Sequence, residues 1–138
     1  MKSIFDTLLR QPRRLFLVDG LGALVSAFFL GVIFVRYPQL SGMPLPTLRI
    51  LASLPAIFLL FDAYCFFNKL PRIAPFLRTI ALLNGGYLLL SLYFLYQHAP
   101  LLSTLGWVYF ISELLIISLI IGIEWSLAGQ LPTTNPEE

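Results

Sequence analysis

The stretch LFLVDGLGALVSAFFLGVIFV, residues 15–35, decides the fold of this chain. About 20 helical residues cross the hydrocarbon core of a bilayer. The stretch reaches that length with one charged residue, Asp19, inside it. A run of this kind predicts a transmembrane helix.

Three further apolar runs of similar length follow, at residues 48–67, 79–96 and 105–127. Each contains at least one charged or amide residue, as the first run does. We therefore expect an all-α, polytopic membrane protein whose four transmembrane helices form an antiparallel bundle.

The composition of the whole chain agrees with four spans. Of 138 residues, 58% are hydrophobic and 12% are charged, and the mean hydropathy is +0.85. A soluble domain of this size would not cover so much apolar surface, and four spans leave no room for a nucleotide-binding or protease domain. We expect a basic cytoplasmic arm or interfacial helix at residues 1–14, a transmembrane domain at residues 15–128 and a disordered cytoplasmic tail at residues 129–138.

The basic residues are distributed unequally between the two ends of the predicted bundle. Lys and Arg accumulate on the cytoplasmic side of a membrane protein. Seven basic residues precede the first span or surround the connection between the second and third spans, against two at the opposite end. The seven are Lys2, Arg10, Arg13, Arg14, Lys69, Arg72 and Arg78, and the two are Arg36 and Arg49. We therefore expect a protein of the cell inner membrane with both termini in the cytoplasm.

Prolines and small residues predict local features of the spans and their connections. Pro12 should end a short helix in the N-terminal arm, and Pro55 should kink the second span. The connection at residues 37–47 holds three prolines, so we expect it to be extended and without regular structure. Ala23, Ala27 and Gly31 follow Asp19 at intervals of four, a spacing that marks a helix-packing face.

Polar residues inside the spans form the candidate intramembrane polar site. Charged groups in lipid are costly and tend to be kept where they pair or function. With the topology above, the two aspartates, the arginine and the second glutamate fall in the inner half of the membrane. The candidate residues are Asp19, Asp62, Arg78, Asn84, Glu113 and Glu124.

Two pairings within this site are expected. Asp62 and Arg78 belong to neighbouring spans joined by a short connection, so an ion pair between them is predicted. Glu113 lies near the bilayer centre without a basic residue at its depth. It is therefore expected to be neutral at pH 7, or hydrogen-bonded to Asn84, Tyr87 or Tyr109. Asn84, Tyr87 and Ser91 should share one helix face.

Three stretches carry a resemblance to a known group of proteins: LVDGLGA at residues 17–23, SGMP at residues 41–44 and YFISE at residues 109–113. Through them, residues 15–128 resemble an uncharacterised family of small four-span membrane proteins of Bacteroidetes-type bacteria. This resemblance implies the fold and no particular activity. The chain is also similar in size and span number to small multidrug resistance proteins, with Asp19 in the place of their first-span carboxylate, but it lacks the later motifs of that family.

Three functions remain open from the sequence. The first, which we favour, is a structural or accessory membrane subunit in which the polar groups hold helices together or meet another subunit. The second is a small proton- or cation-linked permease that uses the membrane carboxylates, in particular Glu113 and Asp62. The third is an enzyme acting on a lipid or quinone, which is not expected because no nucleophile–base set or phosphate-binding motif is visible.

The sequence also limits the molecules that the protein is expected to bind. One cysteine, Cys65, and one histidine, His98, do not make a structural metal site, so no metal and no cofactor are expected. The expected partners are membrane lipids, together with a second copy of the chain or another membrane protein. Nucleic acid is not expected, because the basic residues already serve as topology signals.

Overall fold

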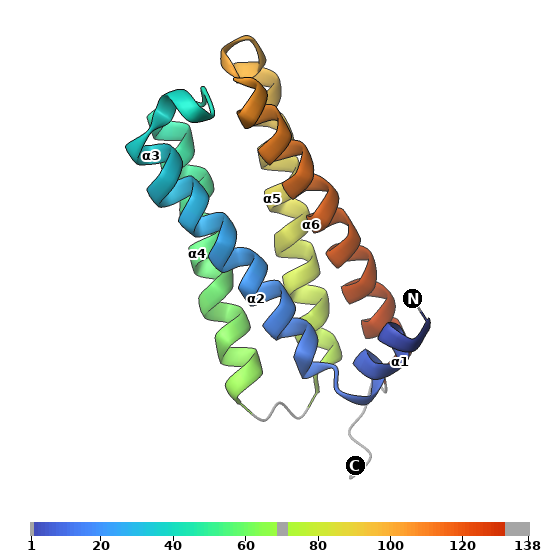
Figure 1. Ribbon diagram of the computed structural model, residues 1–138. Helices are drawn as coiled ribbons and strands as arrows, with labels where there is room; N and C mark the ends of the chain where they lie inside the picture. The colour runs from blue at the N-terminus through green and yellow to red at the C-terminus, as the bar shows by residue number, and fades with distance from the viewer. Residues whose placement is uncertain (1, 69–71, 132–138) are drawn as a thin grey trace.

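Residues 2–68 and 72–131 are described by a computed structural model (Figure 1), with the backbone alone for residues 2–5. Within these residues the chain is helical apart from short connections. Four helical segments there are long and apolar enough to cross a membrane: Arg13–Arg36, Leu45–Phe67, Ala74–Leu101 and Thr104–Gln130. Each contains one of the runs expected from the sequence, so the expectation of an all-helical protein with four such segments is confirmed.

The first span differs from the other three in its backbone. It consists of α2 (Arg13–Phe28), a π-helical turn η1 (Phe29–Ile33) and a last turn α3 (Phe34–Arg36). π-Helical turns inside α-helices occur frequently near functional sites. The other spans are formed by α4 (Leu45–Phe67), α5 (Ala74–His98) and α6 (Thr104–Gln130). α4 runs through Pro55 as one helix.

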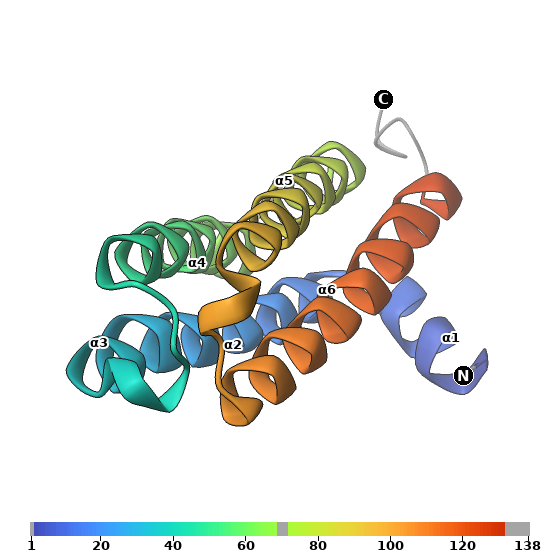
Figure 2. The same ribbon diagram turned by 90° about the horizontal axis from the view of Figure 1, so that it is seen from above.

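The spans are arranged as two antiparallel pairs, α2 with α4 and α5 with α6 (Figure 2). α2 and α4 approach closely because small residues lie between them. A Cβ atom added at Gly31 would lie 3.2 Å from Cβ of Ala52, and one added at Gly20 would lie 3.3 Å from Cβ of Asp62. The predicted packing face is confirmed at Gly31. By contrast, α2 and α6 touch at few points, so the two pairs are separated along this side.

Apolar side chains lie both inside and outside the bundle. Large buried residues come from all four spans, among them Phe16, Leu51, Ile80 and Phe110. The outward faces are apolar as well, and the exposed fraction of Leu60 is 71%. A helix that is hydrophobic all round is typical of a membrane span.

The connections at one end of the bundle are packed tightly against each other. Contrary to expectation, the proline-rich segment is not wholly irregular: it contains the 3-10 turn η2 (Pro38–Leu40), and α4 begins at Leu45, where Pro46 suits a first helical turn. The other connection contains η3 (Ala99–Leu101). The Ser103 amide donates a hydrogen bond to the Ser41 carbonyl oxygen at 2.9 Å and joins the two connections.

The opposite end of the bundle carries the short helix α1 (Lys2–Arg10), which ends before Pro12 as expected. It contacts α6 and α2 and contributes Leu8 to the core. Next to it, the Arg13 guanidinium donates a hydrogen bond to the Phe66 carbonyl oxygen near the end of α4. The disordered tail was expected from residue 129, but Gly129 and Gln130 belong to α6, which continues to Gln130. From residue 132 onward, the expected tail lies outside the described part of the chain.

Candidate functional site

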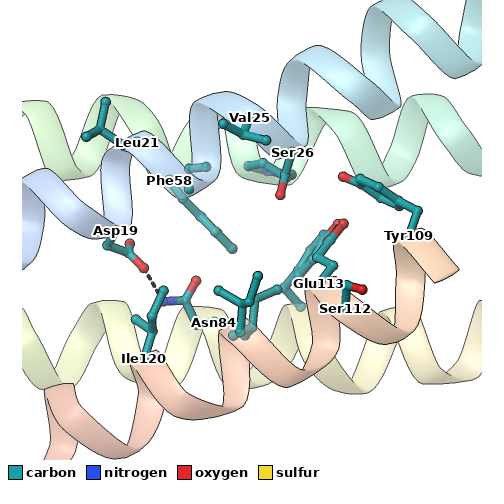
Figure 3. Close-up of a pocket in the computed structure, with 16 residues that line it drawn as sticks. Asp19, Leu21, Val25, Ser26, Phe58, Asn84, Tyr109, Ser112, Glu113 and Ile120 are labelled. Carbon is teal, nitrogen blue, oxygen red and sulfur yellow. Dashed lines mark hydrogen bonds between the residues drawn. The ribbon is translucent and has the colours of Figure 1, made fainter. Parts of the chain in front are cut away.

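A cavity of about 370 Å³ lies between the two helix pairs and is lined by residues of all four spans (Figure 3). Its lining is mainly apolar, but polar side chains reach it from three of the spans. These are Asp19, Ser26, Asn84, Tyr87, Tyr109, Ser112 and Glu113. No Lys or Arg is among the described residues that line it.

The amide of Asn84 joins three helices at one end of the cavity. Its Nδ2 atom donates a hydrogen bond to Oδ1 of Asp19 on α2 at 2.9 Å and another to Oε1 of Glu124 on α6 at 3.2 Å. Asn84 itself belongs to α5, and all three side chains are buried. The second carboxyl oxygens, Oδ2 of Asp19 and Oε2 of Glu124, have no hydrogen-bond partner among the described residues.

Glu113 forms a second polar centre farther along the cavity. The Tyr87 hydroxyl donates a hydrogen bond of 2.5 Å to Oε1 of Glu113, so one of the three expected partners is confirmed. Figure 3 shows the Tyr109 side chain pointing toward Ser26 and Glu113. Glu113 and Tyr109 are close enough to interact, although within the described ranges neither Oε2 of Glu113 nor the hydroxyl of Tyr109 makes a hydrogen bond of normal geometry. Asn84 bonds Asp19 and Glu124 instead of Glu113.

Aromatic rings and aliphatic side chains form the walls of the cavity. The rings of Phe58 and Tyr87 meet edge to face with their centres 6.2 Å apart. Leu21 and Val25 of α2 and Ile116 of α6 line the cavity and are 54%, 53% and 55% exposed. The cavity therefore reaches the outer surface of the bundle between α2 and α6.

Asp62 lies beside this cavity but does not line it. Its side chain is 1% exposed and packs over Gly20. Its carboxyl group is close enough to those of Asp19 and Glu124 for electrostatic interaction. Neither of its oxygens accepts a hydrogen bond from an N–H or hydroxyl donor in the described part of the chain, and the Asp19 carboxyl group is the polar group closest in interaction with it. The sequence-based expectation that three acids gather toward one end of the bundle is therefore matched by this arrangement.

Arg78 does not join these acids, so the predicted Asp62–Arg78 ion pair is wrong. Arg78 is exposed, and its guanidinium carbon lies 6.0 Å from the centre of the Trp125 ring. The reason is helical periodicity. Arg78 and Asn84 are six positions apart, which is ~120° around a helix of 3.6 residues per turn. Since Asn84 faces the cavity, Arg78 must point away from it.

The candidate site expected from the sequence left out several polar side chains that line the cavity. Tyr87 was placed on a polar face but not in the candidate site, although its spacing of three from Asn84 was a usable signal. Ser26 and Ser112 were missed entirely. Ser26 follows Asp19 by seven residues, which places both on one helix face. Cys65 is buried as a small core residue, as expected.

The fold and the cavity define a multi-pass helical membrane protein with buried carboxyl groups beside an internal cavity. Comparison with protein-family models, with curated proteins and with solved structures finds no match to the chain. In residues 2–68 and 72–131, no group of three or more His, Cys, Asp or Glu side chains is arranged to hold a metal ion.

Proposed function

We propose that the protein is a small proton-linked carrier that binds a lipid-soluble organic cation in the cavity between its helix pairs. One observation carries the proposal. One buried carboxyl oxygen of Glu113 and one of Asp19 make no hydrogen bond of normal geometry among the described residues, and both groups line one cavity whose described lining has no Lys or Arg. Carboxyl groups kept inside a membrane protein are functional candidates by default.

The size and lining of the cavity support a ligand of this class. Ligand pockets typically measure ~300–1,000 Å³ and combine apolar walls with a few polar groups. The cavity, about 370 Å³, has this composition. The faces of Phe58, Tyr87 and Tyr109 attract organic cations, and a carboxylate supplies the opposite charge. An opening lined by Leu21 and Ile116 would admit a ligand from lipid.

Proton linkage follows from competition at one carboxyl group. A cation is held by the carboxylate form of Glu113, whereas an empty site in an apolar surrounding is more stable with that group protonated. Binding a cation therefore releases one proton, and the affinity for the cation rises as the pH rises. The hydrogen bond from Tyr87 orients the carboxyl group in both states.

The proposal extends to placement in the cell inner membrane with both termini in the cytoplasm. The support is the charge distribution. At the end that carries α1, the described residues include Arg10, Arg13, Arg14 and Arg72, whereas the opposite end has Arg36 and Arg49. Lys and Arg mark the cytoplasmic side.

The test is binding of benzyltrimethylammonium to the detergent-solubilised protein by titration calorimetry, with proton release measured in a weakly buffered solution. We expect about one proton released per cation bound. Glu113→Gln should fold, bind the cation about 10-fold or more weakly and release no proton, because an ionic contact is lost. Asp6→Asn removes an exposed carboxyl group of α1 and should behave like the wild type. Absence of binding by the wild type would refute the proposal.

A structural subunit is the second candidate function, and one observation favours it. The hydrogen bonds of Asn84 to Asp19 and Glu124 connect α5 with α2 and α6, which is what polar groups do when they hold membrane helices together. In that case Glu113→Gln would leave cellular function unchanged, because glutamine keeps the shape and accepts the hydrogen bond from Tyr87. Loss of function with an intact fold would favour the carrier.

A further inference from the structure

A second, smaller cavity of about 100 Å³ lies on the other side of Asp62. It is lined by residues near the start of α2 and the end of α4, including Phe16, Leu17, Asp62 and Phe67. Leu17 and Phe67 are 43% and 77% exposed, so the small cavity reaches the surface. Its lining residues belong to the half of the bundle that lies nearer to α1. Leu21 lines both this cavity and the central one, so the two adjoin.

Two carboxyl groups separate the cavities. Asp62 lines the small cavity and Asp19 lines the central one. The groups interact electrostatically across the α2–α4 contact, where Gly20 allows Asp62 to approach the helix backbone. Among the described residues, Cys65 and Glu124 also interact electrostatically with Asp62. All described basic side chains lie outside the linings of both cavities.

The hydrogen bonds leave particular oxygens free to carry a proton. Oδ1 of Asp19 accepts from Asn84, so Oδ2 is its available oxygen. Both oxygens of Asp62 are buried and, within the described residues, accept no hydrogen bond from an N–H or hydroxyl donor, and the polar group that they approach is the carboxyl group of Asp19. A buried carboxyl group without a hydrogen-bond donor is costly, so its presence calls for a structural or functional reason. Moreover, the described carboxyl groups are not arranged as a metal site.

We infer that Asp62 and Asp19 form a proton relay that connects the small cavity with the central cavity. The inference rests on the proposed proton-linked function and adds the route that the proton takes through the protein. A proton from the α1 end binds the Asp62 carboxylate and passes to Oδ2 of Asp19. From there it reaches Glu113 through water in the central cavity, which is large enough to hold several molecules and offers them the polar side chains of Ser26, Tyr109 and Ser112. Only one proton moves, and no bond between heavier atoms changes.

The test uses the full chain in liposomes that contain a trapped pH-sensitive dye. Benzyltrimethylammonium is added outside, and the rate of the internal pH change is measured beside equilibrium binding of the same cation. Asp62→Asn should bind the cation within about 2-fold of the wild type, because Asp62 does not line the central cavity. Its cation-driven proton flux should fall ~100-fold, as expected when a positioned proton-transfer group is removed.

Two control variants and a check of folding accompany the flux measurement. Asp6→Asn is the same substitution at an exposed carboxyl group and should keep the wild-type flux, whereas Asp62→Glu should restore much of it. Circular dichroism and gel filtration establish folding, and Asp62→Ser replaces Asp62→Asn if that variant does not fold. Wild-type flux in a folded Asp62→Asn would overturn the relay while leaving the carrier proposal intact. A wild type that neither binds the cation nor moves protons would overturn both.

Discussion

At the scale of single residues, one amide organises one end of the cavity. Asn84 has two N–H donors on Nδ2, and each bonds a carboxyl oxygen of a different helix. Asp19 and Glu124 are buried, and their charges interact with each other and with Asp62. The amide therefore supplies one hydrogen-bond donor to each of two buried carboxyl groups.

We predict that Asn84→Leu lowers the stability of the bundle by about 1–3 kcal/mol, because it removes the donor to two buried carboxyl groups. Unfolding of the protein in mixed detergent micelles, followed by circular dichroism, measures the change. Gln97→Leu replaces an exposed amide of the same helix and should change stability by less than about 0.5 kcal/mol. Equal effects of the two substitutions would show that the Asn84 hydrogen bonds contribute nothing.

At the scale of elements, two glycines allow the connections at one end of the bundle to touch. Gly42 has φ of +81°, a conformation that favours glycine, and a Cβ atom there would lie 2.0 Å from the Leu101 carbonyl oxygen. A Cβ atom at Gly106 would lie 2.2 Å from the Ser41 carbonyl oxygen. The SGMP stretch at residues 41–44 therefore has a structural role, because its contacts lock the α2–α4 pair to the α5–α6 pair.

Gly106→Ala should destabilise the protein by roughly 1–3 kcal/mol, because the added methyl group collides with backbone atoms that cannot easily move. The matched control is Gly122→Ala in the same helix, where no atom lies within 4 Å of the added Cβ. Alanine favours helix over glycine, so this control should be neutral or stabilising. Thermal unfolding in detergent compares the variants, and a tolerated Gly106→Ala would contradict the close contact.

At the scale of the whole molecule, the cavity is a consequence of unequal packing. The pairs α2–α4 and α5–α6 are closely packed, whereas α2 and α6 touch little. The space between the pairs is filled from one side by Phe58 and Tyr87 and left open on the side of Leu21 and Ile116. The pairs are nevertheless joined at both ends of the cavity, by the contacts of residues 41–44 with the start of α6 and by the hydrogen bond between Asn84 and Asp19.

The orientation of the molecule is predicted from its charges. Reporter fusions after Asn68 and after Gln130 should give cytoplasmic signals, and a fusion within residues 41–44 should give a signal from the opposite side. The physical reason is the accumulation of Lys and Arg at the end that carries α1. A periplasmic signal from the fusion after Asn68 would reverse the orientation and move the entrance of the proposed relay to the outside.

The sequence by itself determined the four spans, their apolar surfaces and the helix face shared by Asn84, Tyr87 and Ser91, because run length and helical period are local properties. It also indicated that Asp19, Asp62 and Glu124 lie near one another, since alternating spans bring them to one depth. Only the tertiary structure decided which groups meet. Tyr87 bonds Glu113, Arg78 points away from Asp62, and a cavity separates the pairs, because the rotation and tilt of each helix depend on packing against its neighbours.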